Sequence, residues 1–339
     1  MFARLRLPVI LGAFALCALA GAQSLDLPSL PIHGIYEEYF ETDPTHRGVV
    51  SMLDYLQLHA DVSKSWRLVA SYCQVPGDKW LEETYAEYDN GPDLVRLGRI
   101  RSDFGFSTWS QLYYTPMVMV PMIRSYGLDV VPGISLDRLD RGAEYETSRG
   151  IFQLQVAAVD SRNDDWHVVP GSLDTAIARL QVSLGPVLLG LNGLGKASDN
   201  VGPGEQMAGV DLIWTMPRLQ VRGEVIKGFG SQGAKGYYAD VFYRPPGLAR
   251  TQVGARAQAV RALTQFTDTA YASYGGNLDE DPALGVATSY QTSQAYTFAA
   301  RQFLTPNLTL SVNYGIGNNT PLSRPLLGWS TQLQFNYRF

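Results

Sequence analysis

The chain has almost no cysteine, because its 339 residues include only two. Cys17 lies in an N-terminal apolar run that we expect to be removed, so Cys73 would be the only thiol of the mature chain. One thiol cannot form an intramolecular disulfide. The fold must therefore be stabilised by its own packing and hydrogen bonds, even in a compartment that would permit disulfides.

Long hydrophobic runs are also missing. The most prominent, residues 7–20, has fourteen residues, whereas a helix that crosses a membrane needs about 20 apolar residues. Arg4 and Arg6 precede this run and Ala-Gly-Ala follows it, which is the pattern of a cleaved secretory signal peptide. We predict three parts: a signal peptide over 1–22, a short lead-in over 23–32 and a single domain over 33–339.

Charge and histidine are scarce as well. Charged residues make up 17% of the chain and the formal net charge is −5, so nothing indicates nucleic acid as a partner. The four histidines are scattered: His33, His46, His59 and His167. Because they lack the spacing of metal ligands, we expect no metal and no cofactor.

What the sequence does contain is repeated alternation of apolar and polar residues. In one segment Leu56 and Leu58 alternate with Tyr55 and Gln57, which is the period of a β-strand. Segments of this kind recur, and the connections between them are alternately short and long. We predict sixteen strands: 33–41, 50–62, 66–72, 81–89, 93–101, 141–148, 151–160, 175–184, 187–195, 206–215, 218–228, 236–244, 248–260, 288–304, 307–317 and 329–339.

The strand count depends most on the region 261–290. Another strand could be drawn there, but it would break the alternation of connections and leave the two chain ends on opposite sides. Residues 190–197 (GLNGLGKA) nearly match a phosphate-binding loop, but Ala197 stands where that motif needs Ser or Thr. We interpret this stretch as a strand with a glycine-rich tip.

Alternating strands can form a soluble sandwich or a transmembrane barrel. Three features favour the barrel: the regular short and long connections, aromatic residues near strand ends, and little charge on the apolar face. In lipid an open sheet edge would leave backbone groups unpaired, so the sheet must close. The sequence therefore predicts an all-β fold, a transmembrane antiparallel β-barrel.

The last predicted strand carries the most specific signal. Trp329, Phe335, Tyr337 and Phe339 share one face, and the chain ends on Phe339. This resembles the terminal strand of bacterial outer-membrane barrels, whose final aromatic residue is recognised by the assembly machinery. The resemblance implies a location in the bacterial outer membrane, a lipid environment, and contact with that machinery through Phe339.

With sixteen strands and its longest connection, about 102–140, after the fifth, the chain resembles Gram-negative porins. In that family a long loop folds into the barrel lumen and narrows it. The resemblance implies that 102–140 folds into the lumen of a barrel of about 16 strands. It also implies a homotrimer that lets small hydrophilic solutes diffuse passively.

A finer resemblance involves the start and end of residues 98–127. The wording LGRIRSDFGF, followed by PMIRSYG, is similar to phosphate-selective and dicarboxylate-specific porins. Those have Leu-Gly-Arg-x-x-x-Pro-Phe-Gly and then Pro-Leu-x-Arg, and this chain departs from them at Asp103, where the pattern has Pro. The resemblance implies anionic solutes.

Arginine is the candidate pore-lining residue, because only five of the 27 basic residues are lysines. If apolar faces point to lipid, Arg338 faces the lumen together with six candidate pore-lining arginines: Arg67, Arg179, Arg218, Arg222, Arg256 and Arg301. Three more belong to the predicted constriction: Arg99, Arg101 and Arg124. The guanidinium fork matches carboxylate and phosphate, and rings of one charge select ions by sign.

Two questions stay open at this level. Inward acids such as Asp61, Glu87, Asp211 and Asp240 could pair with the arginines, which would then hold the wall and loop without selecting anions. Arg99 and Arg101 share strand parity with Val95 and Leu97, so their orientation is undecided. We expect no catalytic residues, but a lipase-like outer-membrane enzyme and a plugged structural or adhesive barrel are the alternatives to a pore.

Overall fold

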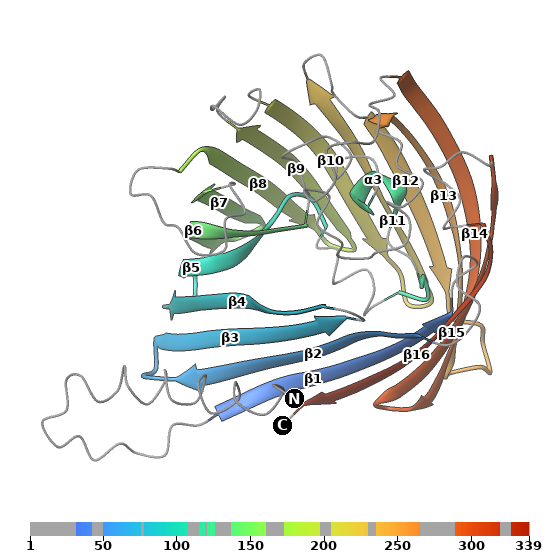
Figure 1. The fold of residues 1–339 in the computed structure, drawn as a ribbon, viewed down its shortest axis with the longest axis horizontal. Coiled ribbons are helices and arrows are strands. Elements are labelled where there is room, and N and C mark those ends of the chain that lie inside the picture. The colour runs from blue at the N-terminus through green and yellow to red at the C-terminus, as the bar shows by residue number, and fades with distance from the viewer. Residues whose placement is uncertain are drawn as a thin grey trace, which may run out of the picture.

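A computed structural model describes residues 32–42, 50–75, 78–106, 115–118, 121–125, 137–160, 173–196, 205–229, 235–264, 289–318 and 327–338. The proposed signal peptide and Phe339 lie outside these residues. The described part contains sixteen strands and one short helix (Figure 1): β1 Ile32–Thr42, β2 Val50–Asp61, β3 Trp66–Val75, β4 Asp78–Asp89, β5 Asp93–Asp103, α3 Met122–Ser125, β6 Asp137–Arg149, β7 Phe152–Asp160, β8 Thr175–Leu184, β9 Val187–Lys196, β10 Glu205–Thr215, β11 Leu219–Phe229, β12 Lys235–Tyr243, β13 Thr251–Thr264, β14 Ser289–Thr305, β15 Leu308–Gly317 and β16 Gly328–Arg338.

The strands form one closed barrel in which every strand pairs with its neighbours in sequence, and β1 pairs with β16. All sixteen pairings are antiparallel, so no strand edge is left open. Closure satisfies the backbone of every strand within the sheet, as a lipid environment demands. The predicted closed antiparallel barrel of sixteen strands is confirmed.

Strand boundaries differ from the prediction by a few residues. β13 begins at Thr251 and not at 248, because Leu248 donates its N–H to the Pro245 carbonyl and belongs to the preceding turn. β6 begins at Asp137, four residues before the predicted start at 141. Residues 265–288, where another strand could be drawn from the sequence, lie outside the described part.

The two faces of the wall have opposite chemistry. In β9 the outward side chain of Leu191 is 56% exposed, while the next residue, Asn192, faces inward and is only 6% exposed. Val210 and Val225 on the outer face are 49% and 58% exposed. An exposed apolar exterior around a polar interior is the arrangement of a transmembrane β-barrel.

Short turns connect the strands at one end of the barrel. Gly150 and Gly185 occupy two of these turns with φ of 60° and 62°, a left-handed conformation that glycine adopts without steric cost. The 187–195 prediction is also confirmed, because the glycine-rich stretch forms β9. Among the residues that the structure describes, no helix is both long and apolar enough to cross a membrane.

Three described segments of the connection after β5 lie against the inner face of the wall: 104–106, 115–118 and 121–125. Phe104, Val118 and Ile123 are each 1% exposed and belong to one apolar cluster with inward residues of β8 to β14. Figure 1 shows α3 inside the ring of strands, where it contacts β12 and β13. The segments after β5 are therefore packed inside the barrel, beside the charged residues of the inner face.

Candidate functional site

Charged side chains gather on the inner face of the barrel and form ion pairs from strand to strand. On the β2–β6 side Arg67 Nε lies 2.8 Å from Asp61 Oδ1, and its Nη1 lies 3.4 Å from Glu87 Oε1. Arg96 continues the series, with Nε 3.0 Å from Glu87 Oε2 and Nη1 2.6 Å from Glu144 Oε1. Five neighbouring strands are thus joined by alternating charge.

On the β8–β10 side Arg179 Nη2 lies 3.2 Å from Asp211 Oδ1, and the Asn192 amide donates to Asp211 Oδ2 at 2.7 Å. On β11–β13 a single carboxylate bridges two arginines: Asp240 Oδ2 accepts from Arg222 Nε at 2.9 Å, and its Oδ1 accepts from Arg256 Nε at 2.7 Å. The Asp240 side chain is fully buried.

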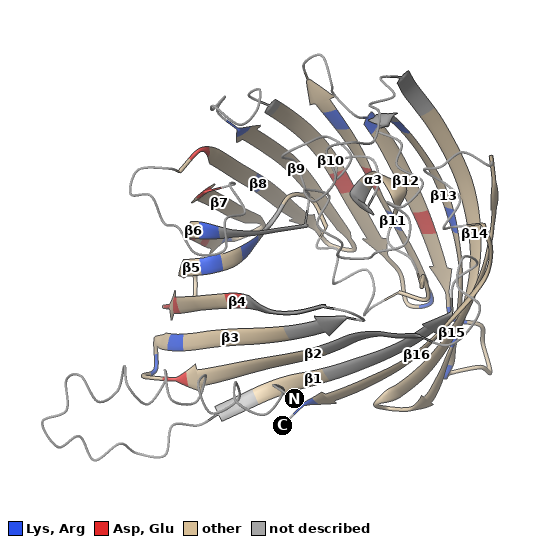
Figure 2. Ribbon diagram, in the orientation of Figure 1, with Lys and Arg blue, Asp and Glu red and all other residues tan. Residues whose placement is uncertain are grey.

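We call these ten residues the charge belt: Asp61, Arg67, Glu87, Arg96, Glu144, Arg179, Asp211, Arg222, Asp240 and Arg256. They lie on strands β2 to β13 and pair with one another across neighbouring strands. Figure 2 shows that basic and acidic residues are spread over these strands. The belt holds five arginines and five carboxylates, so its formal charge is zero. Because each charge has a partner close by, the belt offsets its own desolvation cost and presents little net field to a passing ion.

Arg301 lies beyond the belt, on β14, and is 2% exposed. Its Nε donates to Ser311 Oγ at 2.9 Å and its Nη2 donates to Gln334 Oε1 at 3.3 Å. These neutral partners on β15 and β16 fix the guanidinium plane against the wall. Five predicted arginines therefore do face inward: Arg67, Arg179, Arg222, Arg256 and Arg301.

The other four predicted site residues lie elsewhere. Arg218 is exposed in the turn before β11, outside the strand that was expected to begin there. Arg99 and Arg101 alternate in β5 with Ile100, which is 1% exposed in the inner cluster, so both take outward positions. Arg124 lies in α3, and its side chain is outside the described part of the chain.

Carboxamide side chains of the wall bind the backbone of the segments after β5. Gly105 donates its N–H to Asn192 Oδ1 at 3.0 Å, and Met122 donates to Gln258 Oε1 at 2.9 Å. Asn313 makes two bonds, since it accepts from the Val118 N–H at 3.0 Å and donates to the Pro116 carbonyl at 2.9 Å. We call Asn192, Gln258 and Asn313 the carboxamide clamps.

Aromatic contacts add to these bonds. The guanidinium of Arg179 lies 5.7 Å from the ring centre of Phe106, and three strands further along the wall Arg222 lies 5.1 Å from the ring centre of Phe242 on β12. Such cation–π contacts stabilise a partly desolvated pair by about 1–2 kcal/mol. The charge belt therefore also supports the apolar segment that packs over it.

Glycines in the wall make room for the inner segments. A Cβ added at Gly236 would lie 2.7 Å from Ile123 Cδ1 and 2.5 Å from the Ala259 carbonyl oxygen. At Gly209 the nearest neighbours would be ring carbons of Phe104, at 3.3 Å. Inward positions on β10 and β12 are thus fitted to specific side chains of the connection after β5.

Replacing Gly236 by Ala is expected to lower the free energy of unfolding by about 1–3 kcal/mol, because the wall or α3 must move to accept the methyl group. Gly193→Ala is the matched control, since a Cβ there would meet nothing within 4 Å. Urea titration of the folded protein in lipid vesicles measures both. Equal midpoints for the two variants would contradict the close fit of α3.

Several of these residues were missed in the sequence. Arg96 alternates with Val95 and Leu97, so parity alone could have placed it inward. Asn192 sits within GLNGLGKA, where Gly190 leaves space for Asp211: a Cβ there would lie 2.3 Å from Asp211 Oδ2. The carboxamide clamps had no signal, since a single inward amide on a strand does not reveal what it binds.

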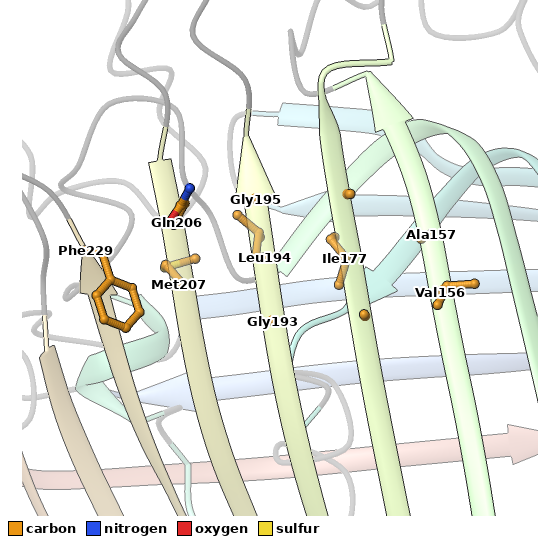
Figure 3. Close-up of a pocket in the computed structure, with 11 residues that line it drawn as sticks. Val156, Ala157, Ile177, Gly193, Leu194, Gly195, Gln206, Met207 and Phe229 are labelled. Atoms are coloured by element: carbon orange, nitrogen blue, oxygen red, sulfur yellow. The ribbon is translucent and has the colours of Figure 1, made fainter.

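A depression with a volume of about 480 Å³ lies along the walls of β7 to β11 (Figure 3). Seven of its eleven lining residues hold outward positions, among them Val156, Ala178 and Phe229, so it opens on the outer face. Gln206 is the only lining residue with a polar side chain. The depression suits an apolar group and contains no nucleophile or acid for hydrolysis.

Comparison with solved structures defines the class of fold. The chain is similar to OmpF of Salmonella typhi in complex with daunomycin, with a TM-score of 0.61 and 10% identity over 91% of this chain and 97% of that one. It is also similar to a loop-deletion mutant of OmpT, an outer membrane protein of Vibrio cholerae (TM-score 0.60, 10% identity, 92% and 99% covered), and to a mutant of the Rh. blastica porin (TM-score 0.58, 12% identity, 91% and 100% covered).

No family model matches this chain, and neither does any curated protein sequence. At 10–12% identity the structural likeness establishes the fold alone. That fold is the sixteen-stranded barrel of outer-membrane proteins, which the chain shares over nearly the full length of the porins compared with it.

Proposed function

We propose that this protein is an outer-membrane porin, a passive channel for small hydrophilic solutes. The observation that carries the proposal is the inner face of the closed barrel, where charged and amide side chains of β2 to β16 collect while the outer face is apolar. A polar interior of this kind suits a water-filled path. The porins that share the fold support the same conclusion.

The segment after β5 forms the constriction in this proposal. Support comes from the carboxamide clamps, which bind Gly105, Val118 and Met122 to three separate strands. The burial of Phe104 and Ile123 against the inner wall supports it as well. A segment fixed at several points narrows the lumen without depending on its own secondary structure. It leaves passage beside β2–β5, where Arg67 and Arg96 keep 39% and 26% of their side chains exposed.

Selectivity for anions is weak in this proposal. The charge belt is neutral, so most of the arginines that could attract an anion are already paired. A small anion preference comes from Arg179, whose buried Nε has no hydrogen-bond partner in the described part of the chain. A phosphate- or dicarboxylate-specific pore would need more cation in the lumen than the belt supplies.

Purified protein in planar bilayers is expected to give discrete conductance steps. In a potassium chloride gradient the reversal potential should be close to zero, slightly on the anion side, because the belt carries no net charge. A protein that folds but conducts nothing would contradict the porin proposal. A strong preference for cations would contradict the role given to Arg179.

The porin proposal also includes the location of the protein and its assembly. The exposed apolar face contacts outer-membrane lipid, residues 1–22 direct export, and Phe339 engages the barrel-assembly machinery. A homotrimer is the proposed assembly, supported by the trimer form of Vibrio cholerae OmpT among similar structures. Crosslinking in native membranes followed by gel electrophoresis tests the subunit number.

A lipase-like enzyme is the second candidate, and an acyl-ester assay with a serine-reactive probe separates it from a porin. The outer depression on β7–β11 offers a place for an acyl chain, but its lining residues hold no Ser, His or acid. The porin is therefore the function that the geometry supports best. A barrel that conducts only after its inner segment is released would instead be a plugged structural barrel.

A further inference from the structure

Three arginines gather at the short-turn end of the barrel, where β10 to β13 are joined. Arg218 directly precedes β11, while Arg244 and Arg250 flank the turn between β12 and β13. Arg244 donates its backbone N–H to the Arg218 carbonyl at 2.9 Å, one position beyond the last pair of the β11–β12 register. These two arginines therefore stand directly opposite each other. We call Arg218, Arg244 and Arg250 the mouth arginines.

The mouth arginines continue the inward positions of their strands. Arg222, Asp240 and Arg256 face the lumen, and each mouth arginine lies four or six residues further along one of the same three chain segments. An even number of residues returns to the same face of a strand. The group therefore lies on the lumen side of the rim, between the charge belt and the water at this end.

The side chains of the mouth arginines are exposed, and none forms an ion pair or hydrogen bond with the described part of the chain. The neighbouring short turns, 184–187 and 305–308, contain no acidic residue. Along β11 to β13 the nearest carboxylate is that of Asp240, which already bridges Arg222 and Arg256. Like charges directly opposite each other are destabilising, so an anion bound at this mouth would relieve the repulsion.

The turns that carry the mouth arginines have a fixed backbone. In the first turn the Met216 N–H donates to the Leu219 carbonyl at 2.7 Å, and in the second the Leu248 N–H donates to the Pro245 carbonyl at 3.2 Å. Each turn also contains proline, whose φ is locked by its ring. Donors that are held in place before binding lose less freedom when a ligand arrives.

We propose that the mouth arginines bind the diphosphate group of a soluble molecule. A guanidinium offers a planar fork of donors that matches two oxygens of a phosphate. Two linked phosphates carry about three to four negative charges near neutral pH, which the three arginines balance. A soluble molecule fits better than a lipid headgroup, because the arginines take inward positions while the outer face near this end presents Trp214 and Tyr243, which are 41% and 38% exposed. The proposal requires a folded barrel but not that it conducts.

Calorimetric titration of the purified protein with inorganic pyrophosphate tests this site, in neutral detergent micelles at low salt. An exposed ion pair strengthens binding by up to about fivefold, so R218Q/R244Q/R250Q should bind at least about tenfold more weakly. The single variant R244Q should bind about two- to fivefold more weakly, which keeps the test valid if the triple variant does not fold. Unchanged binding in both variants, or no binding by the unaltered protein, would overturn the proposal.

The matched control is K64Q/K227Q/K235Q, which removes the same formal charge from three other exposed positions. It should bind pyrophosphate as the unaltered protein does, and an equal loss in the control would overturn the site. Two acids outside the described part, Asp26 and Asp129, precede β1 and β6. D26N/D129N should bind no tighter than the unaltered protein, since tighter binding would mean that the chain itself occupies the site.

Two further measurements separate the source of the ligand and the porin proposal. Native mass spectrometry from micelles with phosphatidylglycerol tests a lipid headgroup as the occupant. More phosphatidylglycerol on the unaltered protein than on R218Q/R244Q/R250Q would overturn the assignment to a soluble molecule, and equal retention supports it. Conductance is recorded on the same samples: a protein that binds pyrophosphate but conducts nothing keeps this site and contradicts only the porin proposal.

Discussion

Replacing Asp240 by Asn is expected to cost about 3–5 kcal/mol of unfolding free energy, the largest effect of any single substitution in the wall. The Asp240 carboxylate is fully buried and lies 2.9 Å from Arg222 Nε and 2.7 Å from Arg256 Nε. Asparagine keeps the shape but removes the charge, so two buried guanidinium groups lose their common partner. Urea titration in lipid vesicles measures the loss.

The same substitution should change ion selectivity. The charge belt would carry one net positive charge in place of none, so the reversal potential should move to the anion side. A barrel that keeps its stability but shows this shift would mean that water solvates the two arginines in the lumen. Unchanged stability and unchanged selectivity together would contradict the role of Asp240.

Two further variants separate charge from packing. Asp93→Asn breaks an ion pair at the short-turn end, where Arg149 Nη2 lies 2.9 Å from Asp93 Oδ2 and its side chain is 58% exposed. An ion pair this exposed contributes little, although Asp93 also accepts hydrogen bonds from Tyr145 and Thr147. This control should therefore cost much less stability than Asp240→Asn. The triple variant D240N/R222Q/R256Q removes acid and bases together and should recover much of the stability lost in Asp240→Asn.

The sequence was sufficient for the architecture because a β-barrel wall has a period of two. Leu191 beside Asn192, or Val210 beside Asp211, already tells which residue faces outward and which inward. Regular alternation of short and long connections then sets the direction of each strand. The alternating pattern does not show where a turn ends and a strand begins. Leu248 belongs to a turn, so the predicted start of β13 was wrong by a few residues.

Pairing within the site could not be predicted in the same way. Parity places Arg222, Asp240 and Arg256 on one face, but only the register shows that all three lie directly opposite one another. For Arg99 the parity with Leu97 was visible, while the resemblance to specific porins suggested the opposite orientation. Ile100 belongs to the inner apolar cluster, so the neighbouring Arg99 faces outward, as its parity with Leu97 indicated.

Contacts between the inner segments and the wall are the least predictable part of the molecule. Val118 and Asn313 are far apart in sequence, yet the Val118 N–H donates to Asn313 Oδ1 at 3.0 Å. Nothing in the local sequence of β15 distinguishes Asn313 from any other polar residue that faces water. A side chain that binds a backbone N–H or carbonyl group leaves no pattern in the sequence, because any residue type can supply that backbone group.

Removing the carboxamide clamps together, as N192A/Q258A/N313A, is expected to raise single-channel conductance and current noise. Four hydrogen bonds to Gly105, Pro116, Val118 and Met122 are lost. Each contributes about 1 kcal/mol, so the loss is comparable with the free energy that holds a short segment in place. Planar bilayer recording with a series of polyethylene glycols measures the change in limiting pore size.

The control for this variant is Q153A/Q155A, which removes inward amides of β7 that bind Glu146 and Glu144 and not the inner segments. It should leave the conductance and the limiting solute size nearly unchanged. If the clamp variant conducts as the unaltered protein does, the segments after β5 do not limit the pore. If only the clamp variant conducts, the segments close the barrel completely. If Asn192, Gln258 and Asn313 hold a constriction, the unaltered protein should conduct, and only the clamp variant should show a higher conductance and a larger limiting solute size.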